Sequence, residues 1–222
     1  MQWWSDKLIK PTHGLTPGEL RDFLLHGTQQ YMKASSVVTT CRIRRNFGQQ
    51  FINVKIELYG DKPHVVDCWI NIDLDFNAKQ LTVQSVQVND AGKGMGTALS
   101  SNIEGLARKL GYGAVSLFAA KAAGPYFWPR RGYIPTQDDW TASIAPEIRN
   151  WLDKLVVAAK IPADVKAEGG EILRDKDPQA ITRIAALREP MIASSRNPET
   201  LIPLGRALLA ESDITYNASL RL

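Results

Sequence analysis

The sequence predicts an α+β fold, in which helices flank a mixed β-sheet and a mostly helical C-terminal extension follows. Strand-like runs joined by short links occupy residues 51–88, and a glycine-rich loop then leads into a helix and a further strand. The chain has 222 residues, 44% of them hydrophobic, so it is long enough to bury a core. We expect a core over residues 1–140 and, packed on it, an extension over residues 141–222.

The first expected element is an N-terminal helix over about residues 17–32. Thr16 followed by Glu19 is a capping-box pattern, in which each side chain accepts a hydrogen bond from the other residue's backbone N–H group. Pro17 stands at the first helical position, where its missing N–H group costs nothing. Apolar residues recur at helical spacing up to Met32.

Three strands should follow, over residues 51–59, 65–76 and 81–88. In the middle strand, apolar and polar residues alternate with the period of two that is typical of a half-buried strand. Its apolar face consists of Val66, Cys68, Ile70, Ile72, Leu74 and Phe76. The links are short and rich in turn residues, so neighbouring strands should run antiparallel, as a meander.

A β-α-β unit comes next. The spacing of apolar residues predicts a helix over about 96–110, and Gly111 stands where a glycine commonly ends a helix. The apolar run over 114–120 is typical of a buried strand. A crossover helix joins parallel strands, so residues 114–120 should pair in parallel with residues 81–88.

The C-terminal extension should be mostly helical and end in a strand. Apolar spacing predicts a helix over 145–160, and the pairs Asp177–Pro178 and Asn197–Pro198 are typical helix starts. We interpret residues 161–172 as a loop. Alternation over 214–222 predicts the last strand. Three roles for the extension stay open: shaping an acceptor pocket, forming a homodimer contact or docking a protein partner.

Gly92, Gly94 and Gly96 stand at the start of the helix over 96–110. A helix N-terminus presents unpaired N–H groups and a partial positive charge, and glycine lets an anion approach closely. Several N–H groups, each worth roughly 1.5–3 kcal/mol to a charged oxygen, would hold a pyrophosphate. The spacing fits neither a dinucleotide fingerprint, because Thr97 replaces its third glycine, nor a P-loop. A glycine-rich connection that binds nothing is the alternative.

An aromatic-rich turn, which includes residues 126–133, follows the strand over 114–120. In its order of elements, the chain resembles the GNAT acyltransferase superfamily over roughly residues 50–135. The family's loop pattern, Gln/Arg-x-x-Gly-x-Gly/Ala, aligns with residues 91–96, with Ala91 at the first position. The family's aromatic pair, followed by Gly and an aromatic residue, aligns with Phe127–Trp128 and Gly132–Tyr133.

The resemblance implies a sheet that splays between two central strands and binds acetyl-CoA or another acyl-CoA there. The pyrophosphate would sit on the loop residues Gly92, Lys93, Gly94, Met95, Gly96 and Thr97. The pantetheine arm would run along the strand over 81–88 like an added strand, pairing with the backbone of Val86 and Val88. Lys93 would supply charge in place of the family's Gln or Arg.

The reaction that the resemblance implies is N-acyl transfer, in which an amine attacks the thioester directly in a ternary complex. The family often has a tyrosine where this chain has Trp128, and an indole cannot donate a proton to the departing thiolate. Tyr126 is the nearest substitute and our candidate catalytic residue. Asp73 and Asp75 share one face of a neighbouring strand; we interpret them as a solvated face and assign no general base.

Charge and composition also bear on nucleic-acid binding, metal binding and cellular location. The formal net charge of +4 permits an anionic ligand but does not predict nucleic-acid binding. The three histidines and two cysteines lack metal-ligand spacing, so we expect no metal. The sequence shows no signal-peptide pattern, no apolar stretch of membrane-spanning length and few cysteines, which favours a cytoplasmic protein that does not bind a membrane.

Two functions remain. The favoured one is an acetyl-CoA-dependent N-acetyltransferase whose acceptor, a protein or a small molecule, carries an amine. The alternative is a catalytically inactive module of the same fold that still binds CoA. Ala91 and Trp128, which depart from the family pattern, keep this alternative open.

Overall fold

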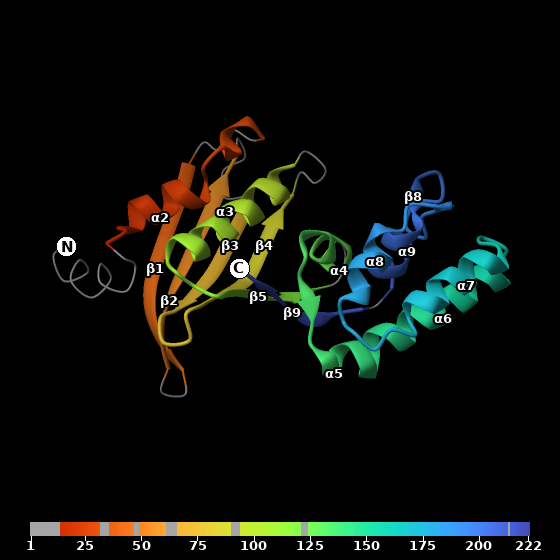
Figure 1. The fold of residues 1–222 in the computed structure, drawn as a ribbon. Coiled ribbons are helices and arrows are strands. Elements are labelled where there is room, and N and C mark those ends of the chain that lie inside the picture. Colours follow the sequence, from red (N-terminus) through yellow and green to blue (C-terminus); the bar gives the residue numbers. More distant parts are fainter. Residues whose placement is uncertain are drawn as a thin grey trace. The chain divides into compact units, whose positions relative to one another are not determined.

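The structure is a computed structural model that describes residues 14–31, 36–46, 49–60, 66–89, 94–120, 124–212 and 214–222, without the side chains of residues 44–46, 49 and 50. The chain forms two compact units, and Figure 1 labels many of their helices and strands. The first unit reaches Leu117 and includes Arg221 and Leu222, and the second spans Phe118–Leu220. The two units therefore divide inside a strand after Leu117, whereas the sequence placed a division near residue 140. The roles assigned to residues 1–140 and 141–222 stay predictions.

The N-terminal helix is shorter than the sequence predicted. Helix α2 spans Pro17–Leu24 and a 3₁₀ turn, η2, spans Thr28–Gln30. The capping box is confirmed, because Glu19 N donates to Thr16 Oγ1 at 3.2 Å and Thr16 N donates to Glu19 Oε2 at 2.7 Å. The extension of this helix to residue 32 is wrong: Gly27 takes a left-handed φ of 70°, which ends the helical path, and Met32 lies outside the described residues.

A mixed sheet forms the centre of the first unit. Its strands lie side by side in chain order: β1 (Ser36–Asn46), β2 (Gln49–Tyr59), β3 (Val66–Asp75), β4 (Gln80–Val88) and β5 (Ala114–Ala119). The first four run antiparallel, and β4 pairs with β5 in parallel. The α+β class, the meander and the parallel pair are thereby confirmed. The sequence did not predict β1, whose described side chains are exposed or half-buried and so give a weak apolar pattern.

Helix α3 (Met95–Lys109) makes the predicted crossover from β4 to β5. It ends as predicted, with Gly111 at a left-handed φ of 68°. Helices α2 and α3 lie side by side on one face of the sheet (Figure 1), and the side chain of Asn102 joins them. The buried sheet residues include Ile52, Val54, Ile56, Cys68, Ile70, Ile72, Leu74, Leu81 and Val83.

One extra residue interrupts the pairing of β4 with β3. Val83 lies opposite Ile72, but Ser85 lies opposite Asn71, so Gln84 is a β-bulge. Because side chains alternate along a strand, the extra residue returns Val86 and Val88 to the face that Val83 occupies. The bulge therefore places the buried Leu81 and Val83 and the half-buried Val86 and Val88 on one face of β4 despite their uneven spacing.

The second unit combines several helices with short strands. In chain order its elements are α4 (Gly124–Phe127), η3 (Pro129–Arg131), β6 (Ile134–Pro135), α5 (Gln137–Asp139), a π-helical turn (Trp140–Ile144), α6 (Ala145–Val157), α7 (Ala163–Ile172), α8 (Ala180–Ala186), β7 (Met191–Ala193), β8 (Leu201–Pro203), α9 (Leu204–Ala210) and β9 (Tyr216–Arg221). β9 is the predicted last strand and pairs antiparallel with β6. Helix α8 begins close to the predicted start at Asp177–Pro178 but with Gln179 as its N-cap residue, and Asp177 Oδ1 accepts from Gln179 N at 2.9 Å in the turn before it.

Two expectations for this unit are wrong. Residues 161–172 form helix α7 instead of a loop. Gly169, which looks like a helix breaker, lets α7 approach α6 so closely that a Cβ atom there would lie 2.9 Å from Leu152 Cδ1. Asn197–Pro198 starts no helix: Asn197 Oδ1 accepts from Glu199 N at 3.3 Å in a tight turn, and the chain returns as β8.

Candidate functional site

The start of helix α3 presents a set of backbone N–H groups. Its N-cap residue, Gly94, has a φ of 92° and no side chain that caps the helix. The first intrahelical bond runs from Ala98 N to Gly94 O at 3.0 Å, so the N–H groups of Met95, Gly96 and Thr97 have no partner in the described part of the chain. A Cβ atom at Gly96 would meet nothing within 4 Å, which means open space. This geometry suits close approach of an anion.

Gly92 and Lys93 were predicted to complete this cradle. They lie outside the described residues, as do Asp90 and Ala91. Their contribution, and the binding role of Gly94 to Thr97, stay predictions.

Tyr31, which the sequence analysis did not single out, lies against Gly94. A Cβ atom at Gly94 would be 3.1 Å from Tyr31 Cε1 and 3.5 Å from its hydroxyl oxygen. Gly94 is therefore required both by its left-handed φ and by the tyrosine ring packed on it. No pattern in the sequence links these two residues, because the contact depends on how α2 and α3 pack.

β4 has a free edge beyond its parallel partner. The pairing of β4 with β5 ends at Val83, opposite Leu117, while β4 continues to Val88. On the other side, β3 pairs with β4 up to Val88. Among the described residues of this unit, nothing pairs with the second edge from Ser85 to Val88. The predicted splay between the two central strands would begin at this point, and Val86 and Val88 lie on the free edge.

Neither aspartate on the polar face of β3 is a free base. Asp73 accepts hydrogen bonds at both carboxylate oxygens, from Asn53 Nδ2 and from Gln84 Nε2, each at 2.7 Å. Asp75 Oδ1 accepts from the backbone N–H groups of Asn77 and Ala78, each at 2.9 Å, and so caps the turn between β3 and β4. Asp73 is half-buried on the expected polar face and, in addition, joins β3 to β2 and β4 through these hydrogen bonds.

Tyr126 lies in α4 of the second unit and is half-buried. Arg130 Nη1 donates to its hydroxyl oxygen at 3.3 Å, and an arginine cannot accept, so the phenol proton is directed elsewhere. The buried Tyr216 holds this segment by donating from its hydroxyl to Pro125 O at 3.1 Å. Burial raises the pKa of Tyr216, so it stays a donor. The catalytic role of Tyr126 stays a prediction.

Trp128 packs instead of facing solvent. Only 9% of it is exposed, and its ring meets that of Tyr133 edge-on with centroids 5.1 Å apart. Phe127 also meets the Trp128 ring edge-on, with centroids 4.9 Å apart. The aromatic pair of the family pattern is therefore part of the packing of this turn.

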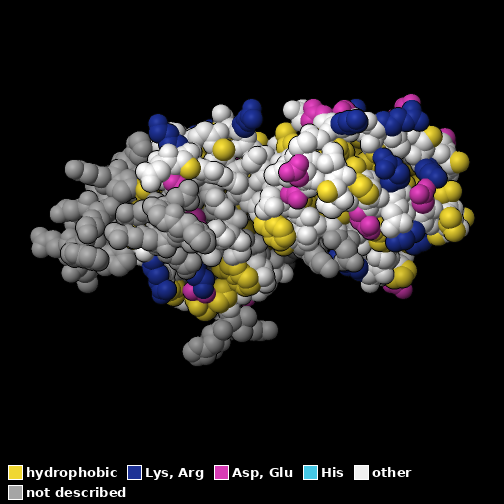
Figure 2. All heavy atoms as spheres, turned by 90° about the horizontal axis from the view of Figure 1, so that it is seen from below, with side chains coloured by type: hydrophobic (Ala, Val, Ile, Leu, Met, Phe, Trp, Pro, Cys, Tyr) yellow, Lys and Arg dark blue, Asp and Glu magenta, His cyan; other side chains and the backbone are white. Residues whose placement is uncertain are grey.

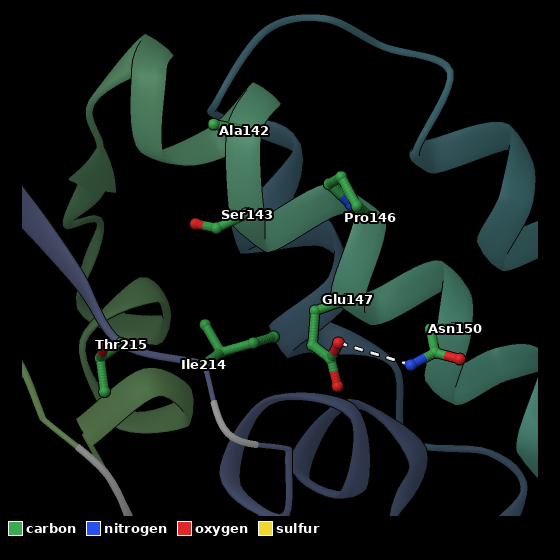
Figure 3. Close-up of a pocket in the computed structure, with 7 residues that line it drawn as sticks. All are labelled: Ala142, Ser143, Pro146, Glu147, Asn150, Ile214 and Thr215. Carbon is green, nitrogen blue, oxygen red and sulfur yellow. Dashed lines mark hydrogen bonds between the residues drawn. The ribbon is translucent and has the colours of Figure 1, made fainter.

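A pocket of about 670 Å³ opens within the second unit, between the π-helical turn, the first turns of α6 and the segment before β9 (Figure 3). Among the residues that the structure describes, Glu147 is the only charged one that lines it, and Asn150 Nδ2 donates to Glu147 Oε2 at 3.5 Å. Pro146 and Ile214 supply apolar surface. A carboxylate repels phosphate, so this pocket does not suit the CoA phosphates. No residue that the sequence singled out lines it.

Charge is mixed on the face of the second unit that Figure 2 shows. On the face in Figure 2, its basic and acidic side chains alternate and do not gather into one basic patch. In the described part of the chain, no group of three or more His, Cys, Asp or Glu side chains could hold a metal ion. None of the helices among those residues combines the length and apolar character needed to cross a bilayer.

Comparison with known proteins gives distant likenesses. No protein-family model matches the sequence, and no curated protein matches it significantly. The chain is similar to the crystal structure of nourseothricin acetyltransferase, with 17% identity, 55% of this chain and 81% of that chain covered, and a TM-score of 0.33. It is also similar to an acetyltransferase from Bacillus cereus ATCC 14579, with 14% identity, 53% and 76% covered, and a TM-score of 0.29. Likenesses at these TM-scores carry no conclusion about substrate or mechanism.

Proposed function

We propose that the chain is an N-acetyltransferase of the GNAT type, which binds acetyl-CoA in its first unit and acts on an amine. One observation carries the proposal. Within a single compact unit, the free edge of β4 beyond Val83 is followed in the chain by the uncapped start of α3 at Gly94. A ligand with an extended amide-bearing arm and a pyrophosphate matches both features.

The start of α3 fits the pyrophosphate. The N–H groups of Met95, Gly96 and Thr97 are unpartnered among the described residues, and each would contribute roughly 1.5–3 kcal/mol to a charged oxygen. The helix dipole adds a partial positive charge at the same place. We propose that Gly92 and Lys93 complete this cradle.

The edge of β4 fits the pantetheine arm. An extended chain with amide groups adds to a free sheet edge through main-chain hydrogen bonds. Val86 and Val88 lie on this edge, past the last parallel pair. We propose that their backbone groups align the arm and hence the thioester at its end.

When bound, acetyl-CoA supplies the activated acetyl group. The amine nitrogen attacks the thioester carbonyl carbon, the C–S bond breaks and its electrons pass to sulfur, which takes up a proton, while the new amide nitrogen releases one proton to water. We propose that Tyr126 donates this proton and recovers one from water. The acceptor is an amine-bearing protein or small molecule, and we propose that the reaction takes place in the cytoplasm.

The test is acetyl transfer itself. The protein is incubated with acetyl-CoA and a panel of amines: lysine, a polyamine, an aminoglycoside and a peptide with a free N-terminus. Thiol release is followed, and acetylated products are identified by mass. The control variant is Gly94→Asp, which places a side chain and a like charge at the phosphates.

The proposal expects thiol release that depends on at least one amine and is lost in Gly94→Asp. If the parent binds CoA but acetylates no amine, the chain is an inactive module of this fold. If it neither binds CoA nor releases thiol, the proposal is wrong.

A further inference from the structure

A chain of side-chain hydrogen bonds crosses three strands at the bulge in β4. It starts at Asn53 on β2, of which only 3% is exposed. The two amide hydrogens of Asn53 go to Asn71 Oδ1 and Asp73 Oδ1 on β3, each at 2.7 Å. A buried amide whose donors are both satisfied fixes the positions of its partners.

The chain of bonds continues from Asp73 to the bulge. Asp73 Oδ2 accepts from Gln84 Nε2 at 2.7 Å, and Gln84 is the extra residue of β4. The next residue, Ser85, is also held, because its hydroxyl oxygen accepts from Trp69 Nε1 at 3.1 Å. The bulge is thus fastened to β3 on both of its residues.

The position of the bulge decides what the free edge of β4 presents. Side chains alternate with a period of two, so moving or removing one extra residue exchanges the two faces for every residue after it. Val86 and Val88 would then leave the apolar face. The backbone N–H and C=O groups of the residues after the bulge would also change sides, because they point alternately toward β3 and toward the free edge with the same period of two. The last parallel pair lies at Val83, directly before the bulge.

We propose that Asp73 is a positioning residue for the acyl-CoA arm, because it locks the bulge at Gln84 and so sets which backbone groups the free edge from Ser85 to Val88 presents. This inference rests on the proposed function. It gives the carboxylate of Asp73 a role through Gln84, without contact between Asp73 and the reacting atoms.

The experiment swaps the carboxylate and the amide that meet between Asp73 and Gln84. Gln84→Glu places two carboxylates against each other and should expel the bulge. The double variant Asp73→Asn with Gln84→Glu restores the pair, because the new amide donates to the new carboxylate and still accepts from Asn53. Asn77→Asp, in the exposed turn after β3, is the control for the added negative charge.

Calorimetry measures the affinity of each variant for CoA and for ADP, which carries a pyrophosphate but no pantetheine arm; thermal unfolding shows that each variant is folded. We expect Gln84→Glu to weaken CoA binding by about tenfold or more and to leave ADP affinity within about threefold of the parent. Asn77→Asp and the double variant should bind CoA within about threefold of the parent.

This inference alone is overturned if Gln84→Glu binds CoA as Asn77→Asp does, or if it loses CoA and ADP affinity equally, as a merely structural role would require. Failure of a folded double variant to regain CoA affinity also overturns it. A parent that does not bind CoA overturns the proposed function, and this inference with it.

Discussion

Replacing Gly96 by alanine should raise stability and lower CoA affinity at once. Gly96 is the second residue of α3, has no left-handed φ and would place a Cβ atom in open space. Alanine in place of glycine stabilises a helix by roughly 0.5–1 kcal/mol. In a chain of this size that raises the melting temperature by about 1–4 °C. The methyl group also keeps a phosphate away from the helix start, and losing one N–H contact of ~1.5–3 kcal/mol weakens binding roughly 10- to 150-fold.

Thermal unfolding without ligand and calorimetry with CoA measure the two effects. Gly94→Ala is a control that should have the opposite effect on stability. The φ of 92° at this position costs an L-residue about 1–2 kcal/mol, and the new methyl group would press on Tyr31. It should melt below the parent. If Gly96→Ala melts higher and yet binds CoA like the parent, no phosphate approaches the start of α3 and the reasoning is refuted.

Three further predictions concern the rest of the chain. Tyr126→Phe should lower thiol release from acetyl-CoA by about tenfold to a hundredfold without changing acetyl-CoA affinity; unchanged release would mean that Tyr126 only packs. Gly205→Ala should lower the melting temperature, because its Cβ atom would lie 2.3 Å from a backbone oxygen of α8. Gly170→Ala, whose Cβ atom would have nothing within 4 Å, should raise it. Similar shifts in the two variants would contradict the close packing of Gly205 on α8. Burial raises the pKa of Cys41 to about 11, and burial, with a smaller effect of a nearby carboxylate, raises that of Cys68 to about 12, so neither thiol should react with Ellman's reagent at pH 8 until the protein unfolds.

The core of the first unit could be predicted because local patterns determine it. Alternation along β3 and the helical spacing of α3 both correspond to one buried face, and short links require antiparallel neighbours. The glycine that ends α3 and the capping box of α2 are also local features. These elements hold the start of α3 and the edge of β4, so most of the candidate binding site followed from the sequence.

The remaining features depend on contacts between distant segments. Helix α7 was missed because Gly169 resembles a breaker, while its lack of a side chain is what lets α7 pack on Leu152. The contact of Tyr31 with Gly94 requires the packing of α2 on α3.

The link from Asn53 through Asp73 to Gln84 depends on the register of three strands, which the sequence leaves open. A signal for the bulge was nevertheless present. The apolar residues of β4 fall at 81 and 83 and then at 86 and 88, and this break in the period of two marks an extra residue.

The most direct test of the central claim is a calorimetric titration of the purified protein with CoA, beside the same titration of Gly94→Asp. The free edge of β4 and the uncapped start of α3 predict saturable binding by the parent and its loss in a variant that still unfolds cooperatively. Absence of heat at millimolar CoA, or equal binding by parent and variant, would contradict the claim that this unit binds an acyl-CoA.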